Sequence, residues 1–110
     1  MAGSDLFTGS LDLLILKALS WGPMHGYAIG LWLRQQSGEA LPIAEGALYP
    51  ALHRLERQGH LEEEWGVTDT NRDAKFYRLT RQGRRQLQTE TERWRRYSRI
   101  MDAALNAARP

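Results

Sequence analysis

Apolar residues recur every three or four positions near the start of the chain, which predicts an α-helix with one buried face. The stripe consists of Leu11, Leu14, Ile15, Ala18 and Leu19. Ser10 stands where an N-cap is expected, and Gly22-Pro23 would end the helix. A second apolar stripe on the same helix consists of Leu6, Leu13 and Leu16. One small core rarely needs two stripes, so we expect this second side to face a partner subunit.

A second helix is predicted from His25 to Ser37-Gly38, because glycine readily adopts the left-handed conformation that ends a helix. Its buried side would consist of Ile29, Trp32 and Leu33. The Leu41-Pro42-Ile43 segment that follows is expected to be extended, since a residue before proline avoids helical geometry.

A third helix is predicted from about Glu45 to Gln58, closed by Gly59. Pro50 falls in or near its first turn, where the missing N–H costs little. Its core stripe would be Leu48, Leu52 and Leu55. The residues that would lie on the other sides of this helix are Gly46, Tyr49, His53, Arg54 and Arg57. The exposed face is therefore polar, aromatic and partly basic.

Two segments with the pattern of β-strands, residues 61–67 and 75–79, follow this helix, and a turn-rich segment at residues 69–73 lies between them. Alternating apolar and polar positions around such a turn predict a β-hairpin. Glu62, Glu63 and Glu64 in the first run cannot all face one substrate, because successive strand residues point to opposite sides. We interpret them as a solvated strand edge that discourages aggregation.

A final arginine-rich helix is predicted from Arg81, with Thr80 as its N-cap. Its apolar positions are Leu87, Trp94, Met101, Leu105 and Ala108. This heptad-like stripe is too long for one small domain to bury, so it predicts dimerisation. We therefore divide the chain into a domain at residues 1–80 and a dimerisation helix at residues 81–110.

Composition narrows the function classes. A chain of 110 residues fits one domain with a modest core and leaves little room for a large active-site cleft. It contains no cysteine, so neither disulfides nor thiolate metal sites are available. No apolar run approaches membrane-spanning length, and the start lacks the basic-then-apolar pattern that is expected of a secretion signal. We expect a cytoplasmic protein without a cofactor.

The net charge of +2 conceals an asymmetry along the chain. Residues 1–65 carry four basic and eight acidic side chains, whereas residues 66–110 carry eleven basic and five acidic ones. Such segregation is typical either of a surface that binds polyanions or of a solvated basic helix.

Three short helices followed by a hairpin are the element order of a winged helix-turn-helix, here in a mainly α fold with a small β-hairpin. In that arrangement the third helix enters the major groove of DNA and the hairpin, or wing, contacts the backbone or minor groove. The wing offers Arg72, Lys75 and Arg78 for these contacts. The full candidate set is Gly46, Tyr49, Pro50, His53, Arg54, Arg57, Arg72, Lys75 and Arg78.

Three motifs in this order resemble the PadR-like transcriptional regulators: residues 22–27 (GPMHGY), residues 45–56 (EGALYPALHRLE) and residues 77–83 (YRLTRQG). The resemblance covers roughly residues 8–90. It implies a winged-helix repressor that dimerises through its C-terminal helix and binds an inverted-repeat operator. By position it places Tyr49 in the recognition helix and Arg72 and Lys75 on the wing.

The resemblance also bears on an effector. Some multidrug-sensing members of the family stack planar ligands on a tryptophan of the corresponding helix, and Trp94 is similar to that residue. The dimer or effector surface would comprise Leu87, Trp94, Met101 and Leu105. The alternative is that Trp94 only packs against the first helix of the partner.

Other interpretations remain open at this stage. Tyr49 could belong to the core rather than meet DNA, and the protein could be a winged-helix interaction module without DNA binding. An enzyme is disfavoured, because no nucleophile, base and orienting group form a recognisable motif. His53 and His60 lack a third ligand for zinc, and His25 is expected to be a helix-start residue.

Overall fold

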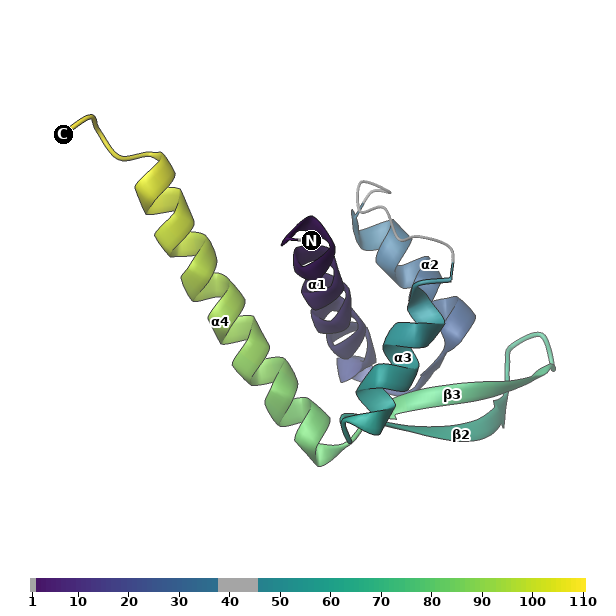
Figure 1. Cartoon of the computed structure of the whole chain (residues 1–110). Coiled ribbons are helices and arrows are strands. Elements are labelled where there is room, and N and C mark those ends of the chain that lie inside the picture. The colour runs from purple at the N-terminus through teal and green to yellow at the C-terminus, as the bar shows by residue number, and fades with distance from the viewer. Residues whose placement is uncertain (1, 38–45) are drawn as a thin grey trace.

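The computed structural model describes residues 2–37 and 46–110, with the side chains of residues 9–37 and 46–110 (Figure 1). A helical body carries a small sheet at one end. The elements in order are α1 (Ala2–Ala18), the 3₁₀ turn η1 (Leu19–Trp21), β1 (Met24–His25), α2 (Gly26–Ser37), α3 (Leu48–Arg57), β2 (Leu61–Val67), β3 (Asp73–Leu79) and α4 (Arg81–Leu105).

One hydrophobic core joins α1, α2, α3 and the sheet. Its largest fully buried side chains are Ile15, Leu16, Leu19, Ile29, Leu33, Leu52 and Tyr77. Leu11, Leu55, Leu61 and Leu79 complete the same cluster, while Trp32, Leu48 and Leu87 pack at its margin. The apolar stripes predicted for the first three helices therefore meet one another, and each amphipathic helix is held by burial of its own stripe.

The sheet has three antiparallel strands in the order β1-β3-β2. The predicted hairpin is confirmed, with Leu61 opposite Leu79 and Val67 opposite Asp73. The sequence did not predict β1, which pairs Met24 with Tyr77. Two residues are too few to show a strand alternation, so only the tertiary structure reveals this strand.

Three predictions about the helices are wrong. α1 begins at Ala2, so Ser10 lies inside the helix and is not its N-cap; a serine caps only where the preceding chain leaves helical geometry. Leu16 is buried in the core instead of facing a partner, because α1 is packed on several sides. α4 ends at Leu105, which leaves Ala108 beyond the helix.

The start of α3 differs from prediction in part. Its first residue is Leu48, with Ala47 at the N-cap position, so Gly46 precedes the helix with a positive φ of 88°. Pro50 does lie in the first turn, as predicted. Glu45 and the Leu41-Pro42-Ile43 segment lie outside the described residues.

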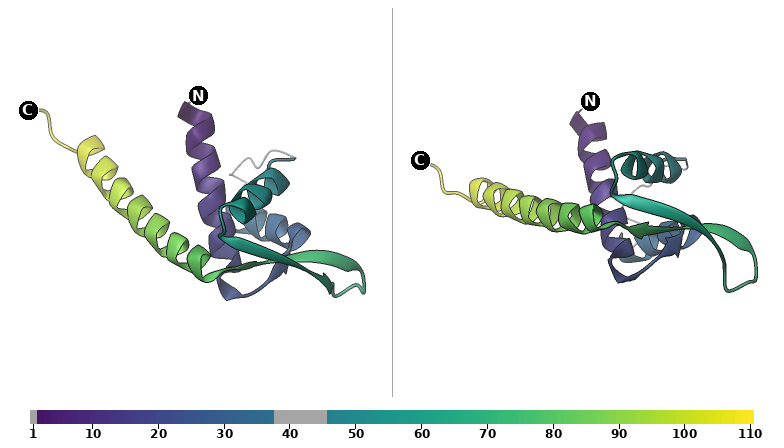
Figure 2. Two further views of the ribbon diagram at one scale, coloured as in Figure 1. Left: turned by 60° about the horizontal axis from the view of Figure 1, so that its bottom comes forward. Right: turned by 90° about the horizontal axis from the view of Figure 1, so that it is seen from below.

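α4 starts with a local cap and a close contact. The Thr80 side chain accepts a hydrogen bond from the Gly83 backbone N–H at 2.9 Å, which confirms the predicted cap. A Cβ on Gly83 would lie 2.1 Å from the His60 carbonyl oxygen, so only glycine allows this approach. α4 packs against α1 and β3 near this end, and the wing and α4 then extend from the body in opposite directions (Figure 2).

The mainly helical fold with a small antiparallel sheet and a C-terminal helix is thus confirmed. The division into residues 1–80 and 81–110 stays a prediction. Within the described residues, no helix combines the length and the apolar character needed to cross a membrane.

Candidate nucleic-acid interface

α3 has a buried side and an exposed side. Ala51, Leu52 and Leu55 are buried against the body. The opposite side exposes Tyr49, Pro50, His53 and Arg57. The side chain of Tyr49 remains 49% exposed, so it is not part of the core. A helix held by one apolar side and open on the other can enter a DNA groove.

The Tyr49 ring rests on the first residue of α2. A Cβ built on Gly26 would lie 2.5 Å from the Tyr49 hydroxyl oxygen and 2.7 Å from two ring carbons. Gly26 therefore gives the ring its place, and α2 orients a side chain that α3 carries.

Arg54 points the other way, towards the body. Its guanidinium forms a two-pronged ion pair with Asp12 of α1, including an Nε donation to Oδ2 at 3.3 Å. Both side chains are partly buried. The structure therefore places Arg54 where it fixes α3 to α1, apart from Tyr49 and His53.

We call β2, β3 and the turn between them the wing. Paired strand residues share a side of the sheet, so the register separates the predicted cations. Lys75 lies on the side that also carries the buried Tyr77, whereas Arg78 lies on the opposite side, paired with Glu62 at 2.8 Å. Arg72 is exposed in the turn, next to Asn71, whose φ is 62°.

Lys75 connects the wing to the exposed side of α3. Its ammonium lies 3.2 Å from Glu63 and 5.8 Å from the centroid of the Trp65 ring. A hollow of about 360 Å³ is lined by His25, Gly26, Tyr27, Tyr49, His53, Ala74, Lys75 and Tyr77. The structure thus brings together three predicted residues, Tyr49, His53 and Lys75. Trp65, which is 71% exposed on the same side of the wing, was not predicted.

Two carboxyls meet where α3 crosses β2. Burial, followed by a hydrogen bond and repulsion from Glu63, raises the pKa of Glu56. Hydrogen bonds from Glu56 and then Lys75 lower the pKa of Glu63. Glu62 and Glu64 lie on the other side of β2, which is an edge strand. This agrees with the prediction that Glu62, Glu63 and Glu64 do not all face one side.

His25 has a structural role at the start of α2. The His25 Nδ1 accepts a hydrogen bond from the Ala28 N–H at 3.3 Å and so caps α2, in agreement with the predicted helix-start role. The centroid of the His25 ring lies 5.3 Å from that of the Phe76 ring, in an edge-on arrangement. Among the described residues, no group of three or more His, Cys, Asp or Glu side chains is arranged to hold a metal ion.

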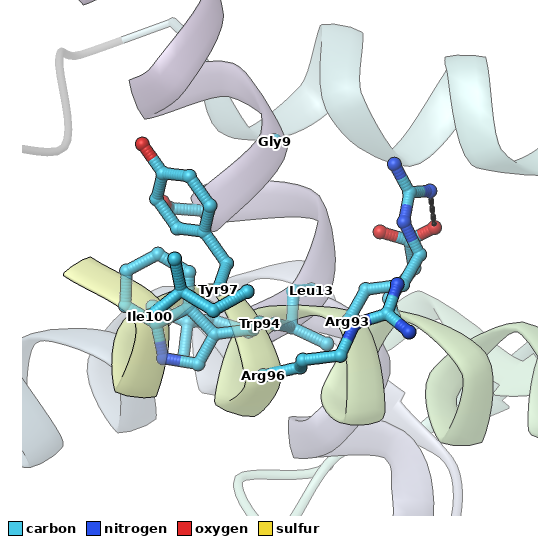
Figure 3. Close-up of a pocket in the computed structure, with 10 residues that line it drawn as sticks. Gly9, Leu13, Arg93, Trp94, Arg96, Tyr97 and Ile100 are labelled. Carbon is cyan, nitrogen blue, oxygen red and sulfur yellow. Dashed lines mark hydrogen bonds and ion pairs between the residues drawn. The ribbon is translucent and has the colours of Figure 1, made fainter. Parts of the chain in front are cut away.

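A second hollow, of about 610 Å³, lies between α1 and α4 (Figure 3). Trp94, Tyr97 and Ile100 line it from α4, and Gly9, Leu13 and Leu14 line it from α1. Of the predicted dimer residues, Leu87 packs on the core, and Met101 and Leu105 are exposed further along α4. Tyr97 and Ile100 were missed, although each follows the preceding member of the stripe at a helical spacing of three.

Comparisons with known proteins agree with this geometry. The sequence matches the transcriptional regulator PadR-like family over residues 15–89. A transcriptional regulator of Mycobacterium tuberculosis is 45% identical over 65 residues, which are 58% of this chain and 59% of that protein.

Two solved structures, each 30% identical to this chain, share its fold. A transcriptional regulator from Clostridium thermocellum has a TM-score of 0.79 and covers 90% of this chain and 93% of its own. A PadR family transcriptional regulator from Eggerthella lenta has a TM-score of 0.75, with 97% of this chain and 91% of its own covered. The motifs, the winged-helix fold and the family match over most of its length agree: this chain belongs to the PadR-like family of transcriptional regulators, which are not enzymes.

Proposed function

We propose that this regulator is a cytoplasmic homodimeric repressor that binds an inverted-repeat operator. The observation that carries the proposal is the exposed side of α3, where Tyr49 and His53 lie beside Lys75 of the wing. An α-helix fits the major groove, whose width is about 12 Å. A flanking wing can reach the adjacent backbone or minor groove.

The candidate residues divide by role in this proposal. Tyr49 and His53 contact base edges, while Gly46, Pro50 and Arg57 surround them on the exposed part of α3 and its start. Arg72 and Lys75 contact phosphates, which supply affinity with little sequence information. Arg54 supports the surface through Asp12, and Arg78 lies at the base of the wing.

The apolar side of α4 supports the homodimer. Trp94, Tyr97, Ile100 and Leu105 are 48%, 53%, 59% and 75% exposed. Such a row along a helix of 25 residues, about 37 Å long, is normally covered by association. A second copy of the same helix offers a matching surface around a two-fold axis.

The hollow between α1 and α4 supports an effector of small, planar and aromatic chemistry. Trp94 and Tyr97 lie 6.3 Å apart between ring centroids and could stack on such a molecule. Binding there would act on the same surface that we assign to the dimer, which offers a route from effector to DNA affinity.

The experiment is a titration of the purified protein with a duplex from the region upstream of its own gene. We expect specific binding that persists in excess random DNA and protection of an inverted repeat in footprinting. Binding to no duplex at low salt would contradict the proposal and favour a protein-interaction module.

A further inference from the structure

The segment that contains the α3 and wing surface carries no net positive charge. Residues 46–79, which contain that surface, carry five Lys and Arg against six Asp and Glu side chains. The 25 residues of α4 carry seven Arg against three acidic side chains. The net positive charge of the chain is therefore concentrated in α4, which favours α4 as a contact for a polyanion.

Five of these arginines share one side of α4. They recur at helical spacing and all are exposed; we call Arg81, Arg84, Arg85, Arg95 and Arg99 the outer arginine face. Two exposed carboxylates, Glu92 and Asp102, lie on the same side, so its net charge is 5 − 2 = +3. The apolar row at positions 87, 94, 97 and 101 lies on the opposite side of the helix. Covering the apolar row by a second copy would leave the outer arginine face open to solvent.

Ion pairs leave this face largely unneutralised. In the described part of the chain, the one salt bridge within α4 joins Arg93, outside the face, to Glu90 at 2.8 Å. Three of the candidate DNA-binding cations outside α4 already form ion pairs, since Arg54, Lys75 and Arg78 each have a carboxylate partner. The outer arginine face thus offers charge without first having to break an ion pair.

The face is continuous with the base of the wing. Arg78, Arg81 and Arg84 line a common hollow of about 390 Å³, which Glu62, the partner of Arg78, also lines. From there the row runs along α4 to Arg99, a rise of about 27 Å at roughly 1.5 Å per residue. That length would span several phosphates of a duplex.

We propose that the outer arginine face of α4 binds the phosphate backbone of duplex DNA and supplies most of the sequence-independent affinity. The inference rests on the DNA-binding function proposed above and extends it to a surface away from α3. Guanidinium groups suit phosphate because they donate hydrogen bonds from a planar fork and stay charged.

The test uses random-sequence duplex and the full chain at several salt concentrations. A variant with all five arginines changed to Gln should bind more weakly, and its slope of log K against log salt should fall by about 0.9 for each phosphate that is no longer neutralised. We expect a fall of at least about 2. The matched control changes the same five residues to Lys, which keeps the charge and should restore the slope.

The outcomes separate the two proposals. Failure of the wild type to bind any duplex overturns the proposed function and this inference with it. Specific operator binding by a Gln variant with a wild-type slope overturns the inference alone. If the five-fold variant unfolds by circular dichroism, Arg95→Gln with Arg99→Gln carries the same test, with an expected fall of about 1.8.

A lipid surface is the competing polyanion, because a basic amphipathic helix can also lie on anionic membranes. Vesicles of phosphatidylglycerol should bind the wild type and the Gln variant equally weakly. Loss of strong vesicle binding in the Gln variant, together with an unchanged DNA slope, would overturn the inference in favour of a membrane contact.

Discussion

The side chain that we expect to read DNA depends on a residue of another helix. Tyr49 is carried by α3, yet its ring occupies the space that any side chain on Gly26 would need. The colliding atoms are the far end of a flexible side chain, so a substitution at Gly26 should displace the ring and spare the backbone.

Gly26→Ala should therefore weaken operator binding as Tyr49→Ala does, by about 1–3 kcal/mol per half-site, because each misplaces one groove contact. Fluorescence anisotropy with a labelled operator measures the change. The double variant should bind no worse than Tyr49→Ala, since the two changes remove one contact. Gly30→Ala on the same helix is the control, because the added carbon meets Leu48 only at an ordinary contact distance of 3.4 Å. Wild-type affinity in Gly26→Ala would contradict this role of the ring.

Glu56 of α3 and Glu63 of β2 have pKa values shifted in opposite directions, so substitutions at the two positions should have opposite effects on stability. The pKa of Glu56 is raised above 4.5 in the folded protein. The contribution of Glu56 to the free energy of unfolding is therefore present at low pH and is lost as the pH rises through the folded pKa. Glu56→Gln should therefore raise the urea midpoint at pH 7.5 and change it less near pH 4.

The pKa of Glu63 is lowered, so its contribution is present above 4.5 and is lost as the pH falls through the folded pKa. Glu63→Gln should lower the urea midpoint at pH 7.5. Shifts of the same sign in both variants would show that the pair is not coupled as described.

At the scale of elements, the sequence predicts what is decided locally. Thr80 and Gly83 are three residues apart, and the cap between them is evident from the sequence. The Arg54–Asp12 ion pair joins positions 42 apart and leaves no local signal, so Arg54 was grouped with the groove residues. β1 exists because β3 offers it an edge, and Leu16 is buried because α1 has neighbours on several sides.

For the wing, Arg72→Ala with Lys75→Ala should weaken binding to operator and random DNA alike, because phosphate contacts carry little sequence information. The slope of log K against log salt should fall by about 0.9 for each phosphate that the wing no longer neutralises. Lys17→Ala, which removes one positive charge from α1, is the control and should leave the slope unchanged. An unchanged slope in the wing variant would show that neither Arg72 nor Lys75 contacts a phosphate.

For α4, Trp94→Ala should shift the protein towards monomer, since removing a large aromatic from an interface costs about 3–5 kcal/mol. Sedimentation velocity over a concentration series measures the shift. Trp21→Ala is the matched control, because Trp21 is 70% exposed on η1 and does not line the hollow that contains Trp94. A Trp94→Ala dimer of undiminished affinity would contradict the interface and the effector site built on it.

At the scale of the whole molecule, the shape of the chain bears on the proposed dimer. The chain measures 62 × 29 × 25 Å, with the wing and α4 pointing away from each other across the body (Figure 2). A pairing through the apolar side of α4 would place the two wings at the far ends of the dimer. The two α3 helices would then address one face of a duplex, as a two-fold operator requires.

The most direct test of this account compares one inverted-repeat operator with the same operator carrying five extra base pairs between its half-sites. The insertion turns one half-site by about half a helical turn of roughly 10.5 base pairs, so a rigid two-fold dimer cannot engage both. We predict that the insertion lowers affinity to that of a single half-site. Equal affinity for the two duplexes would contradict a symmetric dimer that reads its operator through two α3 helices.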